Sequence, residues 1–126
     1  MGLFDWLFGK RAQTALNYNG TNYEYIDMIL QKEFSGFQIV EMVSMRSLCP
    51  DAEFSCMPLT FLLMDDGVPA VGLVLTDKVG SESPRMAATA KTCKAIGLPC
   101  LTLVSGQEHP YEEVVASIRS AMESSK

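Results

Sequence analysis

The sequence has little of what enzymes and nucleic-acid-binding proteins commonly use. It contains one histidine and one tryptophan, and its 10 lysines and arginines are outnumbered by 15 acidic residues, which gives a net charge of −5. Because non-specific binding to duplex DNA needs a cationic surface, this charge balance argues against nucleic acid as a partner. No apolar run approaches the roughly 20 residues of a membrane-spanning helix. No Walker loop, dinucleotide-binding glycine motif or zinc-protease motif occurs.

The single histidine does not indicate a catalytic site. His109 directly precedes Pro110 at an expected helix start, which is typical of a cap or loop residue. A nucleophilic site would need Cys100 or Ser105 beside it, and the G-x-S-x-G turn is absent around Ser105. The sequence therefore favours a protein that is not an enzyme, and we expect no cofactor.

The four cysteines, Cys49, Cys56, Cys93 and Cys100, form two C-x6-C pairs. Zinc sites usually have two to four residues between paired cysteines, so this spacing does not fit the common zinc motifs. Since no secretory signal indicates an oxidising compartment, we expect free thiols in a cytoplasmic protein. A four-thiolate metal or iron–sulfur site is the alternative.

Residues 1–20 form an apolar N-terminal segment and a connector, which precede a single domain over residues 21–126. The segment contains Leu3, Phe4, Trp6, Leu7 and Phe8, and Lys10-Arg11 follow it. A signal peptide has its basic residues before the apolar run, and a myristoylation signal needs Ser or Thr at the position of Trp6. The segment either packs against protein or enters a membrane interface through residues 2–9. Protein is favoured, because so short a helix is marginal by itself.

Three segments have helical patterns. Residues 21–34 begin with a capping box and are predicted to bury Ile26, Ile29, Leu30 and Phe34 before Gly36. Residues 84–96 begin with Ser83 as N-cap and Pro84 and end at Gly97; their expected buried face is Met86, Ala90, Cys93 and Ile96. The last helix, from about residue 110, has one apolar stripe, formed by Tyr111, Val114, Val115, Ile118, Ala121 and Met122.

Strand patterns cover residues 37–44, 59–64, 70–76 and 100–104. The second and third flank an Asp66-Gly67 turn, which predicts a β-hairpin. The third and fourth flank a helix and form a parallel crossover, and the fourth is expected to be buried. We expect an irregular loop over residues 45–58. Together these elements predict an α/β fold: a three-layer sandwich with a mixed central sheet, an αβββαβ core and a C-terminal helix.

The αβββαβ succession over about residues 21–104, with an acidic turn in the hairpin, resembles the restriction-endonuclease-like, or PD-(D/E)XK, nuclease superfamily. The resemblance is closest over residues 70–77, the helix at 84–96 and the Gly97-Leu98-Pro99 turn into the next strand. Small bacterial members of the family have this layout. The resemblance implies a scaffold built for metal-dependent cleavage of nucleic acid.

In that family, an Asp near the start of the second hairpin strand and a Glu-x-Lys on that strand hold a divalent metal and activate water. Asp65 or Asp66 matches the Asp, but the Glu and Lys positions fall on about Val74 and Thr76, which cannot do this chemistry. We therefore expect a degenerate, non-catalytic member without a metal. Its vestigial pocket is expected to contain Asp65, Asp66, Thr76, Asp77 and Lys78.

The expected function is thus protein binding or self-association, with a homodimer as one form. Contact candidates are the apolar residues 3–8 and a small basic strip that contains Lys91 and Lys94. Two alternatives remain: a metal-dependent nuclease with a rearranged site built on Asp65, Asp66 and Lys78, and a peripheral membrane module anchored by residues 2–9.

Overall fold

The computed structural model describes residues 21–124. Its elements follow the order α1 (Thr21–Glu33), β1 (Gln38–Val43), α2 (Met45–Leu48), β2 (Leu59–Asp65), β3 (Val68–Thr76), α3 (Lys78–Ser81), α4 (Pro84–Ala95), β4 (Cys100–Val104) and α5 (Tyr111–Ser124). The N-terminal segment and connector, with the contact candidates Leu3, Phe4, Trp6, Leu7 and Phe8, lie outside the described residues.

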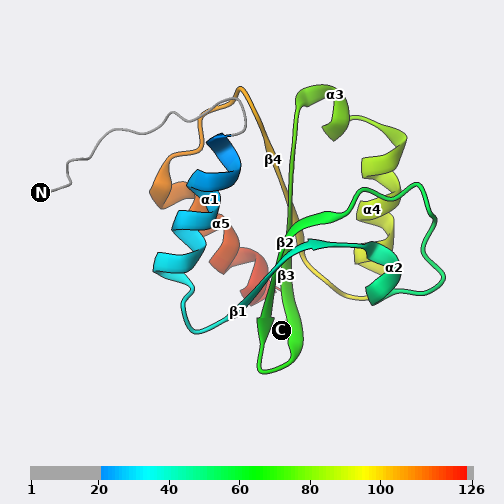
Figure 1. Cartoon of the computed structure of the whole chain (residues 1–126), viewed down its shortest axis with the longest axis horizontal. Helices are drawn as coiled ribbons and strands as arrows, with labels where there is room; N and C mark the ends of the chain where they lie inside the picture. The colour runs from blue at the N-terminus through cyan, green and yellow to red at the C-terminus, as the bar shows by residue number, and fades with distance from the viewer. Residues whose placement is uncertain (1–20, 125–126) are drawn as a thin grey trace, which may run out of the picture.

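The strands form one mixed sheet with the order β1-β2-β3-β4 (Figure 1). β1 pairs antiparallel with β2 and β2 antiparallel with β3, whereas β3 and β4 are parallel. At the hairpin turn, Asp66 and Gly67 both have positive φ, 53° and 82°. Two central residues in this conformation make the type I′ turn that Asp-Gly favours, so the predicted hairpin is confirmed.

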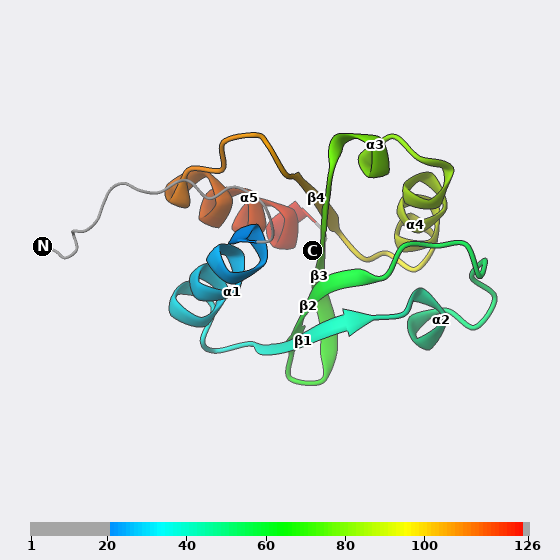
Figure 2. The same ribbon diagram turned by 45° about the horizontal axis from the view of Figure 1, so that its top comes forward.

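Helices cover both faces of the sheet (Figures 1 and 2). α1 and α5 pack on one face, where Phe61 and Leu73 of the sheet meet Ile26, Leu30 and Ile118. The α4 side contains a second core, which includes Leu59, Leu62, Val74, Met86 and Cys93. Over Phe61–Leu63 of β2 and Leu73–Leu75 of β3, side chains alternate between these two cores, as strand geometry requires. The predicted three-layer α/β architecture is confirmed.

Helix α4 begins as predicted but buries a different face. The Ser83 hydroxyl accepts a hydrogen bond from the Met86 N–H, and Gly97 ends the helix at φ 74°. Ala90 and Ile96 are exposed, however, and the fully buried residue between Met86 and Cys93 is Thr89. The Thr89 hydroxyl donates to the backbone oxygen of Met57, 2.9 Å away, which holds the preceding loop against the helix.

Three further expectations were wrong. β4 is half-exposed rather than buried, because it is an edge strand that pairs only with β3. The segment 45–58, expected to be an irregular loop, contains the short helix α2. A second short helix, α3, follows β3. Both helices have four residues, which is too short for a helical pattern to be recognised in the sequence. α1 ends at Glu33, and Gly36 does not have the positive φ of a helix-ending glycine.

Candidate functional site

The five residues of the expected vestigial pocket lie at opposite ends of β3. Asp65 and Asp66 are at the hairpin turn, whereas Thr76, Asp77 and Lys78 follow the other end of the strand. A strand of 9 residues spans about 30 Å. The structure therefore does not bring the two groups together, and Lys78 is not beside the hairpin carboxylates that a rearranged metal site would use.

The residues after β3 are explained by local structure. Asp77 is the N-cap of α3, and its Oδ1 accepts a hydrogen bond from the Gly80 N–H at 2.6 Å. Lys78 lies 3.7 Å from Glu82 in an exposed i,i+4 ion pair. The backbone oxygen of Thr76 accepts from the Ser105 N–H, which joins the ends of β3 and β4.

The strand position where the family would have its glutamate is closed to a metal. Val74 is 2% exposed and packs in the core beneath α4. A charged carboxylate there would be desolvated among apolar side chains, which is strongly unfavourable without a partner. In residues 21–124, no three His, Cys, Asp or Glu side chains converge to hold a metal ion.

That observation also covers the cysteines, so the alternative of a four-thiolate site is wrong for the described structure. All four are free and belong to the α4-side core or pack against it. The Cys93 and Cys100 thiols interact in this core, and a hydrogen bond between them is the largest cause of the pKa shift of each. This bond lowers the pKa of Cys100; the same bond, burial and the charge of the Cys100 thiolate raise the pKa of Cys93.

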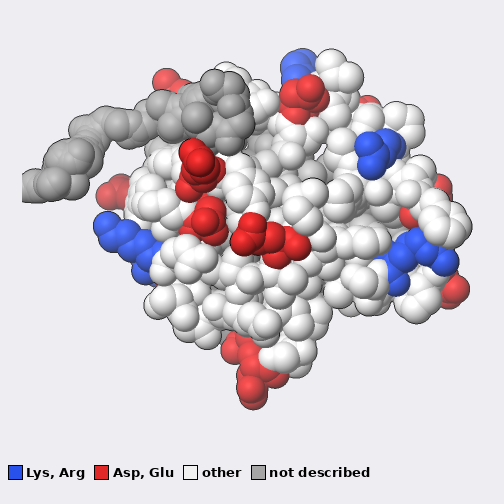
Figure 3. Space-filling view, in the orientation of Figure 1, with Lys and Arg blue, Asp and Glu red and all other residues white. Residues whose placement is uncertain are grey.

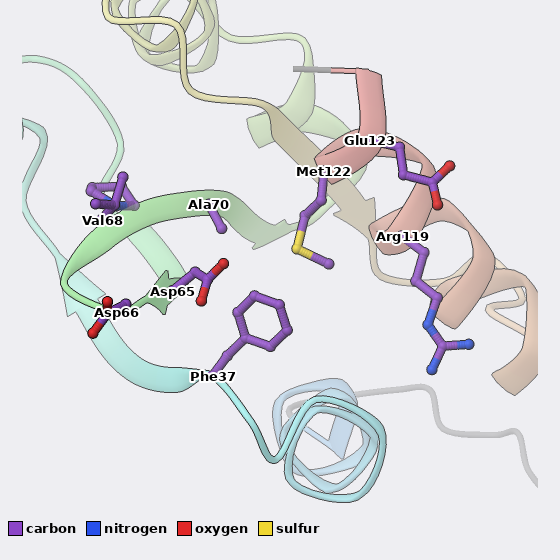
Figure 4. A pocket seen from close by; sticks show the side chains of 9 residues that line it. Phe37, Asp65, Asp66, Val68, Ala70, Arg119, Met122 and Glu123 are labelled. Carbon is purple, nitrogen blue, oxygen red and sulfur yellow. The ribbon is translucent and has the colours of Figure 1, made fainter. Parts of the chain in front are cut away.

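A surface pocket of about 640 Å³ lies between the hairpin turn and the C-terminal half of α5 (Figure 4). Phe37, which connects α1 to β1, and Met122 of α5 point into it together with Asp65. The remaining lining residues come from the hairpin and α5: Asp66, Val68, Pro69, Ala70, Arg119 and Glu123. We call this the hairpin–α5 pocket; it has an apolar floor and a charged rim.

The rim of the hairpin–α5 pocket is predominantly acidic. Asp65, Asp66 and Glu123 supply three carboxylates against the single guanidinium of Arg119. Arg119 already lies 3.7 Å from Glu33 and over the Phe34 ring, 5.5 Å from its centroid. No described cation forms an ion pair with the three rim carboxylates. The rim therefore favours a cationic ligand.

Hydrogen bonds join α1 to the start of α5 and to the loop before it. The Tyr111 hydroxyl donates to Glu33 Oε2 at 2.7 Å, and the Tyr25 hydroxyl donates to the backbone oxygen of His109 at 2.8 Å. The His109 ring nitrogen Nε2 lies 2.8 Å from the Val104 backbone oxygen. His109 thus fastens the loop before α5, in line with the loop role expected of it.

The helices on the two sides of the sheet differ in charge, although Asp51, Glu53, Asp77 and Glu82 lie in the loops and caps beside α2–α4. Helices α2, α3 and α4 carry five cations and no carboxylate, whereas α1 and α5 carry six carboxylates and two cations. Figure 3 shows acidic side chains gathered over the α1 half and at the hairpin, whereas both basic and acidic side chains lie on the α2–α4 half. The predicted contact residues Lys91 and Lys94 are exposed on α4, far from the pocket.

Sequence reasoning found the pocket carboxylates Asp65 and Asp66 but missed its apolar floor. The sequence predicts Met122 as part of the buried stripe of α5, but this stripe is fully buried only as far as Ile118. Phe37 was assigned to a strand that begins one residue later. The one sequence signal for this site is that the apolar stripe of α5 continues past the helical turns that the core can bury.

A scan against protein-family models found no match for this chain, and neither did searches of curated proteins and of solved structures. Among the described residues, no helix has the length and apolar character needed to cross a membrane.

Proposed function

We propose that this protein is a non-catalytic binding module whose hairpin–α5 pocket takes a basic, aromatic segment of another polypeptide. The observation that carries the proposal is the pocket's apolar floor beneath three carboxylates that have no described ion-pair partner. Aromatic anchors in apolar pockets dominate many protein–protein contacts, and carboxylates at the rim select Lys or Arg. Met122 adds an adaptable surface, because its side chain is unbranched and polarisable.

The scaffold side of the proposal is that this chain is a degenerate relative of the restriction-endonuclease-like nucleases, acting by binding in the cytoplasm. Its support is the αβββαβ order together with the apolar environment of Val74. The four free thiols are consistent with a reducing compartment.

The proposal can be tested directly by titrating the isotopically labelled full-length chain with two short synthetic peptides and recording NMR spectra during each titration. One peptide alternates tryptophan with lysine, and the matched peptide alternates tryptophan with glutamate. We expect the lysine peptide alone to shift the signals of Phe37, Asp65 and Met122, with an affinity that falls as salt rises. No binding, equal binding of both peptides, or shifts confined to α4 would contradict the proposal.

A matched pair of variants tests the acidic rim. Asp65→Asn with Asp66→Asn should weaken binding of the lysine peptide about tenfold, the sum of two partly exposed charge contacts. Asn-Gly is favoured in a type I′ turn, so the hairpin should be retained. Glu112→Gln with Glu113→Gln makes the same charge change in the first turn of α5 and should leave the affinity within about twofold.

A further inference from the structure

The chain contains a segment with the chemistry that the hairpin–α5 pocket selects. Residues 3–8 combine leucines with Phe4, Trp6 and Phe8, and Lys10-Arg11 follow directly. Resting on the proposed function, we infer that residues 3–11 dock in the hairpin–α5 pocket of their own chain, as an internal ligand that an outside segment must displace.

The two surfaces are complementary in composition and charge. The aromatic rings of Trp6 and Phe8 match an apolar floor made by Phe37 and Met122, where aromatic and methionine contacts are favourable. The two adjacent cations of the segment match the two adjacent carboxylates of the turn, Asp65 and Asp66. Arg119, the one cation of the pocket, is already paired with Glu33 and opposes this attraction little.

The connector is long enough for docking within one molecule. The pocket lies beside Phe37, beyond the end of α1 that is remote from Thr21. α1 has 13 residues and is about 20 Å long. Residues 12–20, which connect the docked segment to α1, can span up to about 30 Å when extended, which is longer than α1.

Docking in the same chain is favoured over docking in a second copy. A linker of this length holds the segment at an effective concentration of about 1 mM. A second copy competes only when the protein concentration approaches that value. We therefore expect the intramolecular arrangement in dilute solution.

Trp6 is the only tryptophan, so its fluorescence in the full-length chain reports this segment alone. If residues 3–11 are docked, Trp6 emits at short wavelength and is poorly quenched by acrylamide. The Asp65→Asn, Asp66→Asn variant should lower the ratio of docked to free segment about tenfold, which red-shifts the emission and raises the quenching constant. The Glu112→Gln, Glu113→Gln control should leave both unchanged. A fully exposed Trp6 in the unmodified chain, or equal spectra in all three proteins, would overturn the inference.

Two further fluorescence measurements, one on dilution and one with lipid vesicles, distinguish docking in the same chain from docking in a second copy or in a membrane. Intramolecular docking predicts the same emission over about a hundredfold range of protein concentration. An emission that red-shifts on dilution would make a second copy the occupant and overturn the inference. A blue shift that appears only when phosphatidylcholine–phosphatidylglycerol vesicles are added would instead assign the segment to a membrane interface and also overturn it.

One further variant separates failure of this inference from failure of the proposed function. Trp6→Ser with Phe8→Ser removes the internal anchors but no pocket residue. If the segment competes for the pocket, this variant should bind the lysine–tryptophan peptide about tenfold more tightly than the unmodified chain. Equal, pocket-directed binding by both chains would leave the proposed function intact and refute internal docking. Absence of binding by both would refute the proposed function.

Discussion

At the residue scale, Gly80 shows how closely the chain is packed after β3. A Cβ atom at this position would lie 2.0 Å from Thr76 Oγ1 and 3.1 Å from Asp77 Oδ1. Thr76 is β-branched, so its hydroxyl has few other positions available. The turn that contains Asp77 therefore requires glycine for steric reasons, although no positive φ is involved.

We expect Gly80→Ala to lower the free energy of unfolding by about 1–3 kcal/mol, the usual cost of forcing extra atoms into a packed site. Gly36→Ala is the matched control, since a Cβ there meets nothing within 4 Å, and it should change stability by less than about 0.5 kcal/mol. Urea unfolding followed by circular dichroism measures both. Equal effects of the two substitutions on the free energy of unfolding would contradict this expectation, because they would show that Thr76 can move away from the new Cβ without loss of stability.

The Cys93–Cys100 pair has a second residue-scale consequence. The lowered pKa of Cys100 follows from the hydrogen bond that the Cys93 thiol donates, and the thiolate is the reactive form of cysteine. Cys93 combines a raised pKa with an exposure of 1%. The two thiols should therefore differ widely in reactivity although they lie side by side.

We expect iodoacetamide to alkylate Cys100 before Cys93, with a rate that rises as pH rises through the lowered pKa of Cys100. In Cys93→Ala the donated hydrogen bond is lost, so the pKa of Cys100 should rise and its alkylation near neutral pH should slow. Peptide mass spectrometry of timed samples gives both rates. Faster alkylation of Cys100 in Cys93→Ala would contradict the hydrogen bond as the cause.

At the scale of elements, the contact between α1 and α5 depends on a polar pair as well as on the core. Tyr111 of α5 donates to Glu33 of α1, and the pKa of the Tyr111 phenol is raised by burial, by this hydrogen bond and by the charge of Glu33. The folded state therefore keeps the phenol proton at a pH where the unfolded chain has lost it. Stability from this group is present below about pH 10 and is lost as the pH rises further.

We expect Tyr111→Phe to cost about 1 kcal/mol near neutral pH, where the hydrogen bond to Glu33 is lost. Above about pH 10, the unmodified chain should lose stability more steeply than the variant, because the variant has no phenol to ionise at this position. Urea titrations at a series of alkaline pH values measure the two slopes. Parallel slopes would show that the Tyr111 proton is not linked to folding.

The elements that could be predicted from sequence were those with local signals. Ser83-Pro84 and Gly97 bound α4, Asp66-Gly67 forms the hairpin turn, and the stripe of α5 is buried at Val114, Val115 and Ile118. The wrong expectations depended on non-local contacts. Thr89 is buried because its hydroxyl bonds to a distant loop, and β4 is exposed because of its place at the sheet edge.

At the scale of the whole molecule, the hairpin–α5 pocket could not be predicted because its parts are remote in sequence. Phe37, Asp65 and Met122 meet only when the sheet, α1 and α5 are assembled. Each of them has an ordinary local explanation, as a strand, turn or core residue. The sequence indicates the acidic turn. The apolar floor of the pocket could not be predicted, because it depends on where α5 ends relative to the hairpin.

The cations of helices α2–α4 also bear on the partner class of the molecule. Of the five cations on α2–α4, Arg46 donates to the Ala52 backbone oxygen at 2.6 Å and lies over the exposed Phe54 ring, 4.0 Å from its centroid. Arg85 donates to the Ser55 backbone oxygen at 3.0 Å. These two side chains hold the loop before β2, so they are not free to follow a phosphate backbone.

Lys78 is paired with Glu82, which leaves Lys91 and Lys94 as the exposed cations of this face that have no ion-pair partner among residues 21–124. Two or three phosphate contacts give a slope of log K against log salt no steeper than about −3. We therefore expect binding to a fluorescent DNA duplex only at low salt, and none measurable at physiological salt.

Lys91→Glu with Lys94→Glu should abolish this residual binding without changing the affinity for the lysine–tryptophan peptide. Because each phosphate contact releases a counterion, a slope steeper than about −5 would require cations beyond this face, and nucleic acid would then replace polypeptide as the partner class.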